Sequence, residues 1–323
     1  MGTTCENIQK GRVKTNGVGF APSARYIIRR KRMIKASLNI YAIMIFQQII
    51  AGGTHIVAKA VVADIDPATL LFLRTILSII GMMAVFYLNG GRLSIQRQDW
   101  GRFALLGLLG IPINQFLYLY GMKFTTAANG ALLYAATPTF ILLLSHFMLK
   151  ETITAKKAFG IALAFAGITM VIFERGVDFS SEYTYGNIMV LVAVVAWAFF
   201  TILGKEMILK YGALQTTTAM MLAGTALFFP VGLYFSFDFP FSLLRAAHWS
   251  GVLYLGFGTS VLGYLLWYYA LGRIETAKVA VFANGQPIVA TLLSLVFLDY
   301  TITGSFVIGG IITIAGVVIT QLG

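Results

Sequence analysis

Polar side chains interrupt several long apolar stretches of this sequence, and the segment "FANGQPIV" at residues 282–289 is a clear example. Asn284 and Gln286 carry amides, and Pro287 lacks the backbone N–H that the interior of a helix requires. Amides donate and accept hydrogen bonds without ionising, so they suit ligand binding better than acid–base chemistry. The segment predicts a polar ligand site, or a helix break whose freed backbone groups are satisfied by these amides.

Similar side chains recur in the other apolar stretches. Together they predict an aromatic, amide-lined pocket for a neutral, zwitterionic or partly apolar small molecule. The candidate substrate-binding residues are Gln48, His55, Asn114, Tyr118, Tyr134, Trp197, Tyr264, Tyr268 and Asn284. We expect Asn284 rather than Gln286 to face the pocket, because the two cannot share one narrow helix face.

Three ionisable side chains lie within apolar stretches, where a charge is costly. His55 is either a neutral packing residue or the carrier of a coupling proton. Lys59 either snorkels to the outer interface or lines the outer vestibule, where Asp64 or Asp66 could pair with it. Arg74 lies deep enough to need a partner, and we expect a structural salt bridge rather than substrate contact.

Residues for covalent chemistry are sparse. Cys5 is the only cysteine, so neither a disulfide nor a thiolate metal site is available within one chain. "GFGTSVLG" does not form a G-x-S-x-G nucleophile elbow, and no nucleotide-binding loop is present. We expect no catalytic residues, no metal and no cofactor. An intramembrane enzyme acting on a lipid-soluble substrate is the alternative function.

The elements that must position these residues are membrane-spanning helices. The chain has 323 residues, of which 58% are hydrophobic and 11% charged, and its mean hydropathy is +0.82. A helix crosses a bilayer with about 20 apolar residues, and an open sheet edge is not tolerated in lipid. The sequence predicts an all-α polytopic membrane protein with ten transmembrane helices. The expected spans are 38–62, 68–88, 100–122, 126–149, 155–173, 184–204, 215–236, 247–271, 276–298 and 302–321.

The basic residues indicate the orientation of these helices. The net charge of +12 does not indicate nucleic acid, because Lys and Arg gather in the N-terminal tail and in alternate short loops. The other loops hold only Lys123, Arg175 and Arg245. By the positive-inside rule both termini are cytoplasmic, and we expect a bacterial inner membrane. Residues 1–35 read as a disordered basic cytoplasmic tail, and translation could start at Met1 or at Met33.

An internal repeat divides the chain into two halves. Shifting the sequence by 149 residues aligns "LLYAATPTFILLLSHFMLKETIT" with "VFANGQPIVATLLSLVFLDYTIT" without gaps and places Pro138 on Pro287. Each half, 36–175 and 184–322, holds five spans, and an odd number inverts the second half in the membrane. Inverted repeats with broken helices are typical of secondary transporters. We expect Pro138 and Pro287 to be hinges near the membrane midplane.

Several stretches resemble the drug/metabolite transporter superfamily, in its EamA-type branch of ten-helix transporters. They are "GGTHIVAKAVVADIDPATLLFLR", "YLYGMKFTTAANGALLYAATPTFILLLSHFMLKETIT" and "GYLLWYYALGRIETAKVAVFANGQPIVATLLSLVFLDYTIT". The resemblance covers about residues 38–321. Gly52 departs from it, because a Trp is usual there, and His55 is not typical. Asp299 and Tyr300 replace the usual acidic residue after the ninth helix.

The resemblance implies a central cavity lined by helices 1, 3, 4, 6, 8 and 9, with helices 5 and 10 as a scaffold. Gly160 and Gly167, like Gly309 and Gly316, are spaced seven residues apart, which predicts close packing of those two helices. The implied function is export of small organic metabolites, such as amino acids or related compounds, across the plasma membrane by alternating access. The expected partners are that substrate, the lipid bilayer and a proton or other coupling ion, but no nucleic acid.

Overall fold

The computed structural model describes residues 24–149, 153–173, 181–298 and 301–322. In these residues every regular element is a helix. The α-helices are α1 (Ala24–Val61), α2 (Pro67–Leu88), α3 (Trp100–Leu108), α4 (Phe116–Phe124), α5 (Ala127–Ala135), α6 (Thr137–Leu149), α7 (Ala155–Ile172), α8 (Glu182–Tyr211), α9 (Ala213–Ser236), α10 (Ala246–Leu253), α11 (Tyr264–Leu271), α12 (Thr276–Val281), α13 (Gln286–Phe297) and α14 (Gly304–Leu322).

Five short segments complete the set. Three are 3₁₀ turns, η1 (Arg97–Asp99), η3 (Phe241–Leu243) and η5 (Phe282–Gly285), and two are π-helical, η2 (Leu109–Gln115) and η4 (Tyr254–Gly263). The chain up to Ile40 forms a unit of its own, and the arrangement below is that of Tyr41–Gly323.

Ten helical segments are long and apolar enough to cross a membrane, so the predicted ten-helix, all-α fold is confirmed. They are Asn39–Val61, Pro67–Leu88, Arg97–Phe124, Ala127–Met148, Ala155–Ile172, Glu182–Tyr211, Ala213–Ser236, Ala246–Leu271, Lys278–Phe297 and Gly304–Leu322. Of the predicted tail at 1–35, residues 1–23 lie outside the described residues. Residues 24–35 belong to α1, since no Gly or Pro separates the good helix formers Arg and Lys from the first span.

Side-chain caps on the helices follow from residues visible in the sequence. The carboxylate of Asp66 accepts hydrogen bonds from the backbone N–H groups of Ala68 and Thr69, and Pro67 opens α2. The hydroxyl of Thr126 accepts from the N–H of Asn129 at the start of α5. Short side-chain acceptors at this position satisfy N–H groups that the helix leaves unpaired. These caps fix the residues at which α2 and α5 begin.

Two of the ten spans are broken near the prolines. α5 ends at Ala135 and α6 begins at Thr137, while η5 interrupts the span that holds α12 and α13. A proline leaves the carbonyl four residues earlier without its helical donor. The Thr137 hydroxyl donates to the carbonyl of Tyr134 at 2.6 Å, and the Gln286 backbone N–H donates to that of Ala283. Backbone and hydroxyl groups therefore satisfy both breaks, and the Gln286 side chain is left for other contacts.

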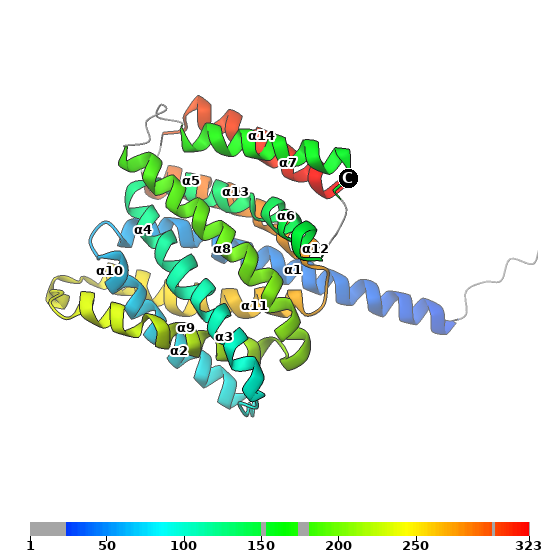
Figure 1. Cartoon of the computed structure of the whole chain (residues 1–323), viewed down its shortest axis with the longest axis horizontal. Coiled ribbons are helices and arrows are strands. Elements are labelled where there is room, and N and C mark those ends of the chain that lie inside the picture. The colour runs from blue at the N-terminus through cyan, green and yellow to red at the C-terminus, as the bar shows by residue number, and fades with distance from the viewer. Residues whose placement is uncertain (1–23, 150–152, 174–180, 299–300, 323) are drawn as a thin grey trace, which may run out of the picture. The chain divides into compact units, whose positions relative to one another are not determined.

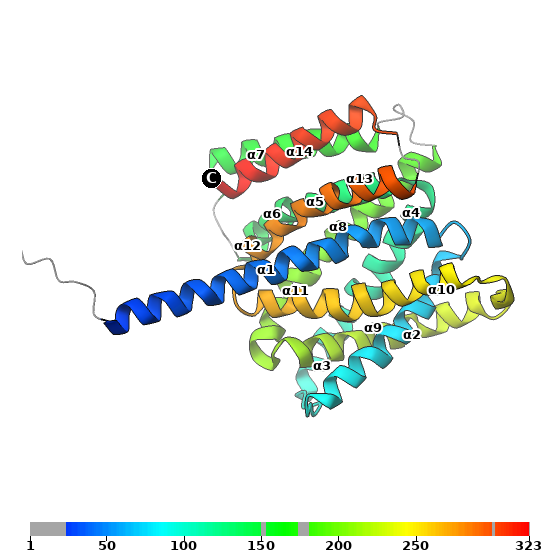
Figure 2. The same cartoon turned by 180° about the vertical axis from the view of Figure 1, so that it is seen from behind.

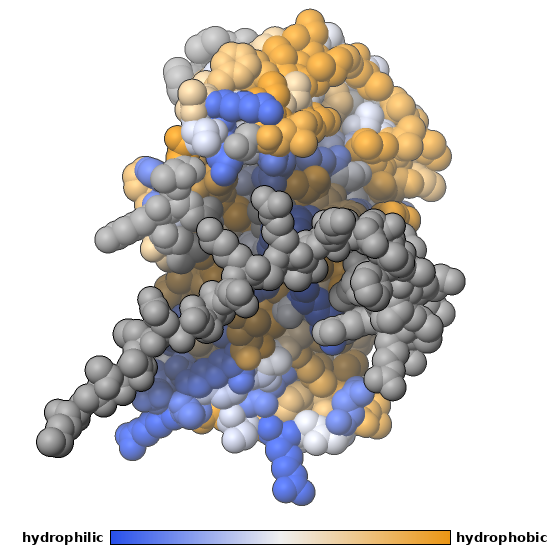
Figure 3. Space-filling view, turned by 90° about the vertical axis from the view of Figure 1, so that its right-hand side faces the viewer, coloured by the Kyte–Doolittle hydropathy of each residue, from blue (hydrophilic) through white to orange (hydrophobic). Residues whose placement is uncertain are grey.

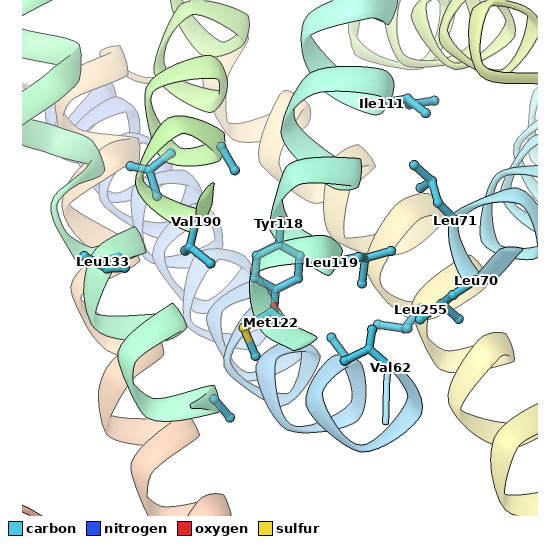
Figure 4. Close-up of a cluster of buried hydrophobic side chains, with 14 of the residues drawn as sticks. Val62, Leu70, Leu71, Ile111, Tyr118, Leu119, Met122, Leu133, Val190 and Leu255 are labelled. Carbon is cyan, nitrogen blue, oxygen red and sulfur yellow. The ribbon is translucent and has the colours of Figure 1, made fainter. Parts of the chain in front are cut away.

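The apolar core surrounds α4. Figure 4 shows Tyr118, Leu119 and Met122 of this helix between Leu133 and Val190 on one side and residues of α2 and η4 on the other. These side chains are almost fully buried. In a bilayer, contacts of this kind hold helices together through close packing rather than through removal of water.

α7 and α14 form a tightly packed pair, which we call the glycine seam. Figures 1 and 2 show the two helices side by side along one edge of the bundle, next to α5, α6 and α13. A Cβ on Gly316 would lie 2.3 Å from the backbone N of Ala164, and one on Gly167 would lie 2.5 Å from the carbonyl O of Gly309. Only glycine permits this approach, so the predicted close packing at these glycines is confirmed.

One end of the bundle carries most of the described basic residues, and we call it the basic end. There Arg102 of α3 pairs with Glu206 of α8, and the Asp99 carboxylate accepts from Lys210 at 2.6 Å and from the Tyr211 hydroxyl. Figure 3 views this end and shows hydrophilic side chains gathered in its lower part, whereas the upper part is mainly hydrophobic. At the opposite end Asp64 pairs with His248 at 2.9 Å.

Candidate functional site

A buried polar cavity of about 80 Å³ lies between the helices. Its walls come from α1, α2, η2, α4, α5, α8, η4, α11 and α13, so both π-helical segments and one helix from each broken span contribute to it. Six of the nine predicted binding residues line it together: His55, Asn114, Tyr118, Tyr134, Trp197 and Tyr264. The other lining residues are Gln47, Ile50, Ala51, Thr54, Arg74, Gln115, Thr259, Gly263, Trp267 and Gln286.

His55 joins α1 to helices from both halves of the chain. Its Nε2 lies 3.0 Å from Oε1 of Gln286, and its Nδ1 lies 2.9 Å from the hydroxyl of Tyr118. In the neutral ring, Nε2–H donates to the amide oxygen and Nδ1 accepts from the phenol, so each nitrogen has a suitable partner. The ring also contacts Tyr134 edge-on at a centroid distance of 5.6 Å. The His55 imidazole therefore links α1 to α4 and α13 through hydrogen bonds.

Gly52 allows α1 to reach this network. A Cβ at this position would lie 2.6 Å from Cβ of Val289 in α13 and 3.2 Å from the carbonyl O of Gln286. The glycine therefore lets α1 approach the start of α13, and His55 lies one turn further along α1. Gly52, which stands where the resemblance has a Trp, and the atypical His55 therefore act together. The close approach of α1 and α13 at Gly52 brings His55 within hydrogen-bond distance of Gln286.

Asn114 and Gln115 extend the network through η2. Asn114 Nδ2 donates to the Tyr134 hydroxyl and to the Ala193 carbonyl, both at 2.7 Å. Gln115 Nε2 donates to the hydroxyl of Tyr264 at 2.9 Å. Gln115 and Tyr264 are 149 residues apart, which is the shift that aligns the two halves of the sequence. Two positions that the predicted shift would align therefore meet in the cavity.

Aromatic rings form one wall of the site. The Trp197 ring lies 5.1 Å from that of Tyr264 and 5.6 Å from that of Trp267 between centroids. Behind them Phe200 and Tyr268 are stacked at 5.2 Å. Rings at these distances pack favourably and present apolar faces with a few polar edges. Such a wall suits an apolar or aromatic part of a ligand.

The two π-helical segments were not foreseen from the sequence. η2 holds Pro112 and contributes Asn114 and Gln115 to the lining, and η4 contributes Thr259 and Gly263. A π segment takes more residues per turn and re-aims the side chains, which is why such segments often occur at functional sites. Pro112 and the glycines of "GFGTSVLG" are the only local signals for them.

Three predicted residues lie outside the cavity. Gln48 is buried beside Gln47, which takes its place in the lining. Tyr268 lies one turn beyond Tyr264, in the stacked layer with Phe200. Asn284 is partly buried in η5, and Gln286 faces the cavity instead, because the 3₁₀ turn changes the rotation of the helix ahead of α13. The expectation that Asn284 rather than Gln286 faces the site was therefore wrong.

Arg74 corrects a second expectation. Its side chain is 2% exposed and lines the cavity, and Nε donates to the Ser260 hydroxyl at 2.8 Å. Over the described ranges it forms no ion pair, so the predicted salt bridge is absent there. The reason is positional, since the described acidic residues lie at or near the helix ends.

Lys59 makes a contact that the sequence did not indicate. Its Nζ donates to the carbonyls of Met122 and Lys123 at 3.0 and 3.2 Å and so caps the end of α4. The expected partners have other contacts, since Asp66 caps α2 and Asp64 pairs with His248. A basic group at a helix C-terminus is stabilised by the unpaired carbonyls.

Comparison with known proteins decides the family. The profile of the EamA-like transporter family matches residues 38–173 and again residues 184–322. The chain belongs to the EamA-like transporter family. Its members are transporters and not enzymes, and the ten apolar helices make the chain an integral membrane protein.

Individual relatives agree with this family. An uncharacterized transporter of Bacillus subtilis, YyaM, is 28% identical over 87% of this chain and 95% of its own length. An uncharacterized transporter of Archaeoglobus fulgidus is 28% identical over 87% of this chain and 96% of its own length. A probable terminal-alkyne amino-acid exporter of Streptantibioticus cattleyicolor is 28% identical over 71% and 76% of the two chains.

A solved structure has the same fold. It is a protein crystal structure that superposes with a TM-score of 0.65 at 20% sequence identity, covering 86% of this chain and 97% of that chain. Across the part of the chain that the structure describes, no group of three or more His, Cys, Asp or Glu side chains could hold a metal ion.

Proposed function

We propose that this EamA-family transporter exports a small organic metabolite, an amino acid or a related compound, across the plasma membrane by alternating access. The observation that carries the proposal is the buried polar cavity between the two parts of the chain that match the family. His55, Asn114 and Tyr134 come from the first match, and Trp197, Tyr264 and Gln286 from the second. A site at the interface of two halves can open to either side when the halves rock against each other.

We further propose that residues 36–175 and 184–322 are inverted repeats, which supports such a motion. The helix breaks near Pro138 and Pro287 correspond at the shift of 149 residues, and so do Gln115 and Tyr264. Five spans in each half invert the second half. The prolines then act as paired hinges, because a break tolerates changes of backbone angle that an intact helix resists.

The proposed orientation places both termini and the basic end in the cytoplasm. Arg102, Lys210 and Arg273 lie near that end, and basic loops are retained on the cytoplasmic side during insertion. With bacterial relatives among those compared, the proposed location is the inner membrane.

The substrate class is supported by the cavity walls and by one relative. Amide and phenol groups can bind the polar end of an amino acid, and the Trp197 wall can contact its side chain. The Streptantibioticus relative is named a probable amino-acid exporter. Coupling of export to protons is part of this proposal, and His55 is the histidine that lines the cavity.

Proteoliposomes holding the purified chain test this proposal. Vesicles preloaded with a mixture of amino acids should exchange or release some of them, unaltered by mass spectrometry, faster than empty vesicles do. Tyr264→Phe should slow this transport, because it leaves the buried amide of Gln115 without its acceptor.

Tyr234→Phe is the matched control, since Tyr234 is 78% exposed and lies outside the cavity. A chemically altered product would point to an enzyme. Equal rates for both variants and the wild type would refute the site.

A further inference from the structure

Arg74 is a charged side chain held inside the membrane-spanning part of the protein. It comes from the first half of α2, it is almost fully buried, and it lines the cavity. Within the described residues its one hydrogen bond runs from Nε to the Ser260 hydroxyl. The other guanidinium donors, on the two terminal nitrogens, have no partner there.

A single hydroxyl cannot compensate for a buried guanidinium. Arginine stays protonated in proteins, so it cannot lose its charge to escape burial. An uncompensated charge away from water is costly, and buried charges in proteins are normally paired. The other lining side chains are neutral, including the hydrogen-bonded imidazole of His55, and none of them is an Asp or a Glu. The cavity is therefore positively charged and lacks an anion of its own.

We infer that Arg74 binds the carboxylate of the transported molecule, which therefore carries a carboxylate group. This inference rests on the proposed transport function and deepens it. A guanidinium presents parallel N–H groups in a plane that matches the two oxygens of a carboxylate. Because Nε already donates to Ser260, the two terminal nitrogens of Arg74 are the donors available to the carboxylate of the ligand.

The rest of the cavity supports a small carboxylate rather than a more highly charged anion. One guanidinium balances one negative charge, so a phosphate dianion would leave a second charge buried. The aromatic wall of Trp197 and Trp267 suits an apolar body on the same molecule.

Two further polar atoms in the lining have no partner in the described residues. Oε1 of Gln115 and Nε1 of Trp267 are buried and make no hydrogen bond there. The first accepts a hydrogen bond and the second donates one. A ligand with an N–H or O–H donor close to its carboxylate, as in an amino acid or a hydroxy acid, would satisfy the acceptor.

Binding to the purified full-length protein tests the inference with matched probe pairs. Thermal stability is measured with L-leucine and L-leucinamide, L-phenylalanine and L-phenylalaninamide, and 4-methylpentanoate and 4-methylpentanamide. We expect at least one carboxylate to stabilise the wild type more than its amide does. In Arg74→Gln that carboxylate should bind at least about tenfold more weakly, with the difference from its amide lost.

Two other variants keep the result interpretable. Arg74→Lys keeps the positive charge but lacks the parallel N–H groups of a guanidinium, so it should retain part of the preference for a carboxylate over its amide. Arg273→Gln removes an arginine at the basic end, which contacts the Tyr269 ring and carbonyl, and should leave the preference unchanged. If Arg74→Gln does not fold, the wild-type pairs and Arg74→Lys still decide.

Several outcomes would overturn the inference. The first is that no carboxylate in the panel stabilises the wild type more than its amide does. The second is that the preference for a carboxylate over its amide survives in folded Arg74→Gln. The third is that chloride or phosphate stabilises the protein equally and also depends on Arg74. Transport of a neutral compound at the wild-type rate in Arg74→Gln would refute the inference but keep the transport function. A carboxylate preference without transport of that carboxylate in vesicles would refute the proposed function alone.

Discussion

The glycine seam and the central cavity are both contacts between the two halves of the chain, yet they are built in opposite ways. In the seam, α7 and α14 approach until backbone meets backbone, and the side chains between them are absent or small. In the cavity, long side chains such as His55, Gln115 and Tyr264 bridge helices that stay apart. The contrast suggests that the seam holds the halves together while the cavity is where they can rearrange.

The seam should be the less tolerant region, and Gly316→Leu tests this with the largest expected effect. The new side chain would collide with the backbone of Ala164. Overpacking costs about 1–3 kcal/mol in cores that can adjust, and two backbones in contact can adjust less. We expect a large loss of folded protein by size-exclusion chromatography in detergent.

Gly304→Leu in the same helix is the matched control for the seam. A Cβ at Gly304 meets no atom within 4 Å, so the yield of folded protein should stay close to that of the wild type. Comparable loss in both variants would mean that α14 tolerates no large residue anywhere, and the seam would not be special.

The cavity should lose function before it loses its fold, and His55→Phe tests that difference. The variant leaves the Gln286 amide and the Tyr118 hydroxyl without a partner, at about 1–3 kcal/mol for each buried group. We expect transport in proteoliposomes to fall by roughly tenfold or more, with most of the protein still folded.

His248→Phe is the corresponding change outside the cavity. Its pair with the exposed carboxylate of Asp64 is of the surface type, worth about 0–1 kcal/mol. Transport should therefore remain near the wild-type rate. A His55→Phe protein that transports normally would remove this network from the site.

The proline breaks provide a smaller test of the idea that the cavity side of the bundle moves. Pro287→Ala restores a backbone donor that could extend α13 into η5 and stiffen the break. We expect a severalfold lower transport rate with unchanged or slightly raised thermal stability. Pro230→Ala, at the proline inside α9, is the control. A Pro287→Ala protein with both rate and stability of the wild type would argue against a hinge.

The smallest expected effect separates two neighbouring amides. Gln286→Ala should weaken transport because it removes a lining group and the partner of His55. Asn284→Ala should change transport less than about twofold, because Asn284 does not line the cavity and its side-chain oxygen makes no hydrogen bond within the described residues. The two transport rates, measured at equal protein content, decide which residue faces the substrate. The opposite order would restore the prediction made from the sequence.

Much of the fold could be predicted because bilayer physics limits the choices. Apolar length alone predicted ten spans, since only helices satisfy their own backbone in lipid. Pro138 and Pro287 marked both helix breaks, because the missing N–H acts locally. Gly160, Gly167, Gly309 and Gly316 marked the seam through their spacing.

The candidate site was predicted less completely, because side-chain direction depends on local helix geometry. Gln47 lines the cavity in place of Gln48, its neighbour in the uninterrupted helix α1. Gln286 lines it in place of Asn284, because the 3₁₀ turn η5 changes the inward face. The partners of Arg74 could not be predicted either. They depend on which distant residues meet α2, and Ser260 is 186 positions away along the chain.

The bond between Gln115 and Tyr264 has a consequence for cross-linking. Its two ends occupy corresponding positions, so under the proposed exchange of the halves each would take over the place of the other, and the contact would survive the cycle. A covalent cross-link between positions 115 and 264 should then permit transport, because this contact is kept throughout the cycle. A tether between positions 55 and 286, which do not correspond, should lock the carrier in one state.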